Sequence, residues 1–143
     1  MPYLRVWIHL VWSTKNREPM LQSNIRGKVF QHIRKNAKEK KIHIDCINGI
    51  VDHVHALVLL SADRALSKMV QLIKGEASHW VNENGLLPFH FEWQEEYFAV
   101  SVSESAVDAV RKYIEEQEEH HRKMRIGEEH DIFIKKYGFW EEG

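Results

Sequence analysis

Apolar and polar side chains alternate in four stretches of the chain, with the period of a half-buried β-strand. The predicted strands are residues 3–12, 42–46, 51–60 and 91–103, the last irregular at Gln94-Glu95-Glu96. In the first strand Leu4, Val6, Ile8, Leu10 and Trp12 share one face, and Arg5, Trp7, His9 and Val11 share the other. Asn48-Gly49 is a strong signal for a two-residue turn, so the second and third strands should form an antiparallel hairpin.

Apolar residues recur at helical spacing in three other stretches. We expect helices from Ser23 or Asn24 to about Lys40, from Asp63 to Asn84-Gly85, and over residues 104–121. Possible capping pairs for the last helix are Ser105 with Asp108 or Ser101 with Glu104. Beyond it, the pattern predicts a charged turn over 121–128, a short helix over 129–137, and Phe139-Trp140 folding back onto the body.

The order strand, helix, strand, strand, helix, strand is that of the ferredoxin-like α+β fold. Two helices then cover one face of a four-stranded antiparallel sheet, and the helix over 104–121 is the natural element to lie over the other face. The chain has 143 residues, of which 43% are hydrophobic, so we expect one domain over 1–143 with its own core.

The net charge of −1 hides an uneven distribution. Lys and Arg are in excess over residues 1–80, and Asp and Glu are in excess over residues 81–143. Such asymmetry can mark a surface that binds a polyanion, although a solvated helix face is the simpler explanation of charge alone. The candidate nucleic-acid-binding residues are Lys15, Arg17, Arg26, Lys28, Arg34 and Lys35, with Lys38, Lys40 and Lys41 nearby.

No apolar run approaches the roughly 18 residues needed to cross a membrane. The first residues lack the order of charges and apolar residues of a signal peptide, so we expect a cytoplasmic protein without a membrane partner. Cys46 is the only cysteine, which excludes an internal disulfide or a thiolate zinc cluster. Its place in an alternating strand pattern predicts a small core residue.

His53 and His55 lie in the third strand and project from the same surface. Apart from Asp52 and the two histidines, the run is apolar on both faces, where an imidazole without a partner is costly. The pair is therefore either hydrogen bonded within the core or used as metal ligands. Asp52 points away from His53 on an ideal strand, so its role is at most a supporting one.

The helix over 104–121 carries a second group of polar residues. Val107, Val110 and Ile114 define its buried stripe; Tyr113 lies on the flank of that stripe and Gln117 lies inside it. Tyr113 and Gln117 share a face one turn apart, and a buried amide needs a partner. Simpler explanations remain open, since Tyr113 can be a boundary aromatic and Gln117 can bond a backbone carbonyl.

Two histidines on a strand, with a tyrosine and a glutamine one turn apart on a later helix, resemble the single-tyrosine HUH transposases of bacterial insertion sequences. The resemblance extends along nearly the whole chain. It rests on Val11-Trp12-Ser13-Thr14-Lys15-Asn16-Arg17, Asp52-His53-Val54-His55, Trp93-Gln94-Glu95-Glu96-Tyr97-Phe98 and Arg111-Lys112-Tyr113-Ile114-Glu115-Glu116-Gln117. It implies the same ferredoxin-like architecture that the pattern predicts.

The resemblance also implies a chemistry. Tyr113 would be the nucleophile and become linked to the 5′ phosphate of a nicked single strand, leaving a free 3′ hydroxyl. His53, His55 and the amide oxygen of Gln117 can hold a divalent ion, Mg²⁺ or Mn²⁺, with His121 as an alternative third ligand. Tyr97 is a rival nucleophile, but its aromatic strand context favours a core position.

The family further implies a homodimer in which the tyrosine helix of one subunit completes the histidine site of the other, and which recognises DNA hairpins at the ends of the mobile element. Two other functions are open. A ferredoxin-like module that binds single-stranded nucleic acid would need no metal. A metal-dependent phosphodiesterase would need the metal but not Tyr113.

Overall fold

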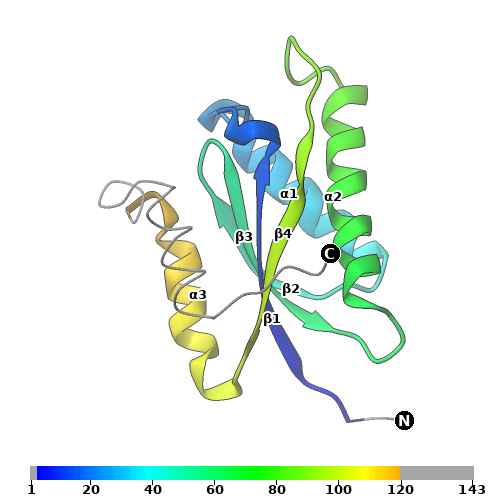
Figure 1. The fold of residues 1–143 in the computed structure, drawn as a ribbon, viewed down its shortest axis with the longest axis vertical. Helices are drawn as coiled ribbons and strands as arrows, with labels where there is room; N and C mark the ends of the chain where they lie inside the picture. The colour runs from blue at the N-terminus through cyan, green and yellow to red at the C-terminus, as the bar shows by residue number, and fades with distance from the viewer. Residues whose placement is uncertain (1–2, 120–143) are drawn as a thin grey trace.

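The computed structural model describes residues 3–119. The strands are β1 (Val6–Thr14), β2 (Ile44–Gly49), β3 (His53–Leu60) and β4 (Trp93–Val102), and the α-helices are α1 (Ser23–Glu39), α2 (Leu66–Glu83) and α3 (Val107–Glu115). Two short 3₁₀ turns, η1 (Lys15–Arg17) and η2 (Glu104–Ala106), follow β1 and precede α3. This order confirms the predicted α+β fold (Figure 1). The elements predicted beyond residue 121, and His121 itself, lie outside the described residues.

The four strands form one antiparallel sheet in the order β2-β3-β1-β4. The histidine strand β3 is therefore interior, with β1 on one side and β2 on the other. In the β1–β3 register, Val11 lies opposite His55 and Ser13 lies opposite His53. Both histidines are thus near the end of β1 that leads into η1.

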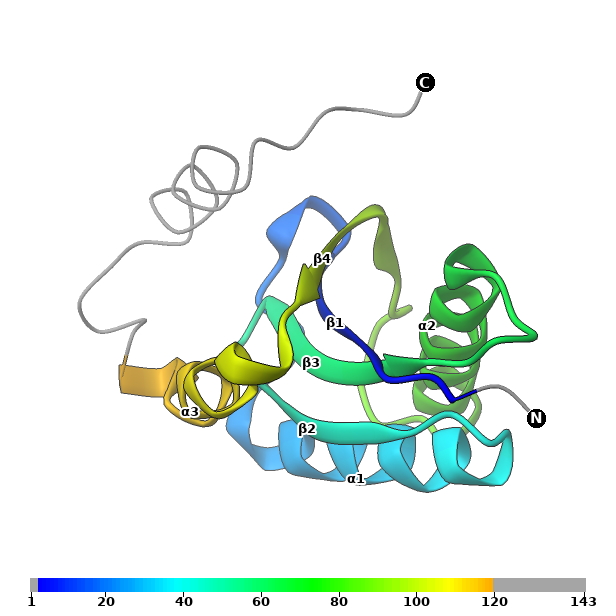
Figure 2. The ribbon, with the colours of Figure 1, turned by 90° about the horizontal axis from the view of Figure 1, so that it is seen from below.

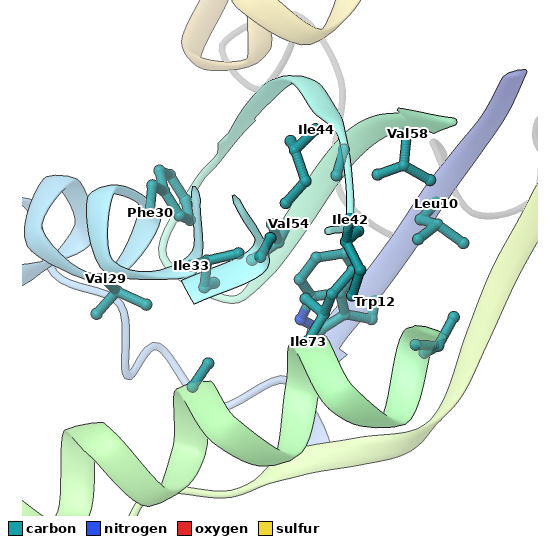
Figure 3. Close-up of a cluster of buried hydrophobic side chains, with 14 of the residues drawn as sticks. Leu10, Trp12, Val29, Phe30, Ile33, Ile42, Ile44, Val54, Val58 and Ile73 are labelled. Carbon is teal, nitrogen blue, oxygen red and sulfur yellow. The ribbon is translucent and has the colours of Figure 1, made fainter. Parts of the chain in front are cut away.

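The main hydrophobic core lies between one face of the sheet and helices α1 and α2 (Figure 3). Ile8, Leu10 and Trp12 from β1 alternate into it, as the sequence predicts. Burying each such side chain stabilises the fold by about 1.5–3 kcal/mol, so this layer holds the sheet and the two helices together. Tyr97 packs at the edge of the same core, which agrees with its prediction as a core residue.

The opposite face of the sheet is covered by α3 (Figure 2). Here Trp7, Cys46 and Leu57 pack against Val107 and Ile114, which form the buried stripe of the helix. The structure thus confirms that the tyrosine helix lies over the face from which His53 and His55 project.

The β2–β3 hairpin is present, but its turn is not where the sequence predicts it. Asn48 and Gly49 belong to β2 and pair with His55 and Val54, and the backbone reverses after Ile50, whose N–H donates to the carbonyl of His53 over 3.0 Å. A Cβ at Gly49 would collide with the His53 carbonyl oxygen. The glycine therefore serves the close approach of two strands rather than the turn.

Two irregularities alter which side chains share a face. The β2–β3 register shifts between Ile44 and Cys46, so these residues enter opposite cores although simple alternation puts them on one face. In β4 the register shifts opposite Ser13, which confirms the predicted irregularity at residues 94–96.

The predicted helix caps are wrong. The N-cap positions of α1, α2 and α3 are Gln22, Ala65 and Ala106, and none makes a side-chain capping bond. A cap is worth about 1 kcal/mol, less than the burial of one large apolar side chain, so packing sets these helix starts. At the start of β1, Tyr3 and Leu4 are exposed and lie outside the strand. Within residues 3–119, no helix is long and apolar enough to cross a membrane.

Candidate active site

His53 and His55 form a buried pair on the face covered by α3. Their side chains are 5% and 0% exposed, and their ring centroids are 5.0 Å apart. In each ring Nδ1 meets a neighbour: Asp52 Oδ1 lies 3.1 Å from Nδ1 of His53, and His9 Nε2 lies 2.9 Å from Nδ1 of His55. When Nδ1 is held in this way, Nε2 is the nitrogen that each imidazole can offer to a metal ion.

The contact between Asp52 and His53 corrects the expectation that Asp52 points away. Asp52 lies in the turn before β3, not within the strand, so strand alternation does not decide its direction. Its side chain is 5% exposed and its carbonyl accepts the N–H of Thr14 over 2.9 Å. A carboxylate behind a histidine fixes the orientation and tautomer of the ring.

Tyr113 reaches the histidine pair from α3. Its ring lies edge-on to His55, with centroids 5.6 Å apart, and edge-on to His9, with centroids 6.1 Å apart. The side chain is partly buried, as its place on the flank of the helix stripe predicts. The structure therefore brings a candidate nucleophile and two candidate metal ligands together from elements about 60 residues apart in the sequence.

Gln117 lies one turn beyond Tyr113 and is 1% exposed. Its amide nitrogen donates to the Tyr113 carbonyl over 3.3 Å, which is the backbone bond that the sequence left open as an alternative. With the nitrogen used in this way, the amide oxygen is the atom suited to a cation. Among residues 3–119 no three His, Cys, Asp or Glu side chains are grouped as a metal site.

The residues present fit a divalent ion. Two imidazoles held at Nδ1 and one buried amide oxygen are ligands that Mn²⁺ accepts, and Mg²⁺ accepts the oxygen and retains several waters. A site with three protein ligands has positions left for water or for the oxygens of a phosphate.

Several polar contacts fix α3 on the sheet. Arg111 forms a two-pronged ion pair with Asp45, at 2.7 and 3.1 Å. This guanidinium holds the pKa of Asp45 below its ordinary value, and the carboxylate raises the pKa of Arg111. The amide of Asn48 donates to the carbonyls of Ile114 and Glu115, each over 3.1 Å. These contacts join the helix that carries Tyr113 to strand β2.

The predicted nucleic-acid-binding residues fall into separate groups. Lys15 and Arg17 lie in η1, directly after the end of β1 that pairs with His53, and Lys15 forms a 2.8 Å ion pair with Glu92. Arg26 is 13% exposed in its side chain and pairs with Glu118 over 2.9 Å. The other three, Lys28, Arg34 and Lys35, are exposed on α1, on the side of the sheet away from the histidine pair.

The sequence reasoning missed His9, Asp45 and Asn48 as neighbours of the site. A signal for His9 existed, because strand alternation puts it on the same sheet face as His53 and His55 once β1 and β3 pair. No comparable signal existed for Asp45, because its direction depends on the register shift in β2.

Comparisons with known proteins identify the family of this chain. A model of the IS200-like transposase family matches residues 3–117. The ISDra2 transposase TnpA of Deinococcus radiodurans is 25% identical over 114 aligned residues, and the match covers 76% of this chain and 81% of that protein.

Two solved structures share the fold. A crystal structure of a Deinococcus radiodurans R1 protein described as a transposase has a TM-score of 0.65 and 22% identity, covering 82% of this chain and 95% of that one. The structure of a REP-associated tyrosine transposase bound to a REP hairpin has a TM-score of 0.58 and 18% identity, covering 80% and 68% of the two chains. Since the family model matches most of the length of this chain, the chain belongs to the IS200-like transposase family.

Proposed function

We propose that this protein cleaves and rejoins single-stranded DNA at insertion-sequence ends, with Tyr113 as the nucleophile of a covalent 5′-phosphotyrosine intermediate. The observation that carries the proposal is the placement of the Tyr113 ring against His55, in a buried histidine pair whose Nδ1 atoms are both held. Tyr97, the rival nucleophile, packs at the other face of the sheet.

In the proposed cleavage step, the hydroxyl oxygen of Tyr113 bonds to phosphorus while the bond from phosphorus to the 3′ oxygen breaks. The tyrosine loses its proton and the departing 3′ oxygen gains one, so the products are a phosphotyrosine and a 3′ hydroxyl. Rejoining is the reverse attack by a 3′ hydroxyl, which releases the tyrosine. Because each exchange replaces one phosphodiester by another, no external energy source is required.

His53, His55 and Gln117 would hold Mg²⁺ or Mn²⁺ in this mechanism. Such an ion, when bound, neutralises the nonbridging oxygens of the phosphate and positions it for in-line attack. Asp52 would orient the imidazole of His53 through its Nδ1 atom. A free tyrosine has a pKa of about 10, so the proton of Tyr113 has to pass to an acceptor during attack.

The proposed substrate is single-stranded DNA with hairpin ends. The structural relative bound to a REP hairpin supports a hairpin as partner. Lys15 and Arg17 are suited to contact phosphates of the strand that enters the site, because η1 follows the end of β1 that pairs with His53. The α1 residues Lys28, Arg34 and Lys35, with Arg26 at the start of the helix, would extend the contact to more distant phosphates.

The proposed assembly is a homodimer with shared sites. Within one chain, α3 already places Tyr113 against its own His55. Every partner of α3, including Asp45 and Asn48, is also present in a second copy, so two chains can exchange the helix and keep the same contacts.

The test is incubation with labelled single-stranded oligonucleotides from the DNA flanking the coding region, with Mg²⁺ or Mn²⁺, followed by a denaturing gel. We expect a covalent adduct with the wild type, none without metal, and none with Tyr113→Phe. Tyr97→Phe is the matched control and should retain the adduct. Cleavage that survives Tyr113→Phe would establish a phosphodiesterase, and binding without cleavage would leave a nucleic-acid-binding module.

A further inference from the structure

His9 is a buried histidine that the proposed chemistry does not yet employ. It lies in β1, its side chain is 2% exposed, and its ring centroid is 5.2 Å from that of His55. Its register partner in β3 is Leu57, so it lies diagonally across from His55 on the same sheet face. The ring of Tyr113 is also close to that of His9, with centroids 6.1 Å apart.

The 2.9 Å contact between His9 Nε2 and His55 Nδ1 restricts the hydrogens of both rings. One of the two nitrogens must donate a hydrogen and the other must accept it. If Nε2 of His55 is to offer a lone pair to a cation, the hydrogen of the neutral ring lies on Nδ1 and is donated to His9. His9 is then the acceptor that selects this tautomer, as Asp52 does for His53.

We propose that His9 is a positioning residue for His55: it fixes the tautomer and the ring orientation that present Nε2 of His55 to the divalent ion. The inference rests on the proposed function only in its last part, the presence of the ion. The hydrogen bond itself, and its effect on the tautomer, belong to the metal-free protein.

Burial strengthens the assignment. An apolar side chain at this position would pack on the sheet without needing hydrogen bonds. A buried histidine, by contrast, is costly to desolvate unless its nitrogens are hydrogen bonded. Its ring contacts both His55 and Tyr113, the residues that a positioning role requires. A side chain with a purely structural role need not supply an acceptor at this nitrogen.

The experiment uses two variants of His9 in the full chain. His9→Gln retains an acceptor oxygen, whereas His9→Leu removes the acceptor and retains apolar bulk. Leu57→Ala is the control, because it creates a cavity in the same layer but removes neither of the two nitrogens that meet between His9 and His55. Each protein is labelled with ¹⁵N-histidine for NMR of the metal-free state and then titrated with Mn²⁺ by EPR of the free ion.

We expect the Nδ1–H tautomer of His55 in the wild type, its retention in His9→Gln and Leu57→Ala, and its loss or mixing in His9→Leu. Mn²⁺ affinity should fall about 10- to 100-fold in His9→Leu, the usual effect of removing a residue that orients a metal ligand, and much less in the other two. The proposal is overturned if the His55 tautomer in His9→Leu equals that of the wild type. It is overturned as well if Mn²⁺ affinity falls no more in His9→Leu than in Leu57→Ala.

Failure of the proposed function gives a different result. A wild type whose His55 has the Nδ1–H tautomer but which binds no Mn²⁺ would overturn both the metal site and the role of His9 toward it. Equal Mn²⁺ affinities of the wild type and of His9→Leu would overturn the His9 proposal alone.

Discussion

At the scale of single residues, the position of Gln117 was predictable and its partners were not. Its place in the apolar stripe of the helix predicted over 104–121 predicts burial, and the side chain is 1% exposed. The structure adds that its nitrogen is bonded to the Tyr113 carbonyl, so the oxygen is the atom that the proposed ligand role would use. Replacing the amide should therefore change metal binding more than folding.

We predict that Gln117→Ala weakens Mn²⁺ affinity by about 10-fold or more, since losing a ligand should cost no less than losing a residue that orients one. The free energy of unfolding without metal should change by only about 1 kcal/mol, the worth of one hydrogen bond. Mn²⁺ titration and urea denaturation measure the two quantities. Gln71→Ala, an exposed amide on α2, is the control. An unchanged Mn²⁺ titration would remove Gln117 from the site.

At the scale of elements, the position of α3 depends on Asp45, which lies at the register shift in β2. The register shift between Ile44 and Cys46 interrupts the alternation of β2 at Asp45, which meets Arg111 on α3. Small displacements of a reacting group can reduce a rate by up to about 100-fold. The ion pair is thus expected to matter for catalysis through the placement of Tyr113.

We predict that Asp45→Asn lowers the rate of adduct formation by about 10-fold or more, because α3 loses the charged partner that fixes its rotation. Exchanging the charges in Asp45→Arg with Arg111→Asp should restore part of the rate, a result that a simple loss of stability does not give. Asp63→Asn, an exposed acid before α2, is the control. A wild-type rate in Asp45→Asn would contradict the positioning role.

The same pair has a defined pH dependence. Arg111 lowers the pKa of Asp45 in the folded chain, so the unfolded chain binds the proton more readily. The stability that the carboxylate contributes is therefore fully present above its ordinary pKa of about 4 and is lost as the pH falls through the lowered value. The difference in unfolding free energy between wild type and Asp45→Asn should be constant near neutral pH and diminish in acid, as urea denaturation at several pH values can establish.

At the scale of the whole molecule, the exchange of α3 between two chains can be tested by mixing inactive variants. Tyr113→Phe and His55→Ala should each form no adduct. In a shared-site homodimer their mixture should recover about one quarter of the wild-type sites, because half of the randomly paired dimers are mixed and each has one complete site. The adduct is quantified on a denaturing gel after the mixed chains have re-equilibrated.

The control for this experiment is a mixture of Tyr113→Phe with Tyr97→Phe, because the Tyr97→Phe chain retains every proposed site residue. No recovery in the test mixture, with sedimentation establishing a mixed dimer, would mean that each chain completes its own site. A monomer at all practical concentrations would exclude the shared site and favour the arrangement found within one chain.

The sequence by itself determined the order of the elements, the sheet faces of His53 and His55, and the burial of Gln117, because these follow from side-chain periods that are local. Only the tertiary structure decided where the β2–β3 turn lies, how Asp52 and Asp45 are directed, and where the helices begin. Each of these depends on register, a strand bulge or packing between distant segments, whose free energies exceed the preferences of neighbouring residues. The pairing of β1 with β3 also placed His9 against His55, a contact that no local pattern contains.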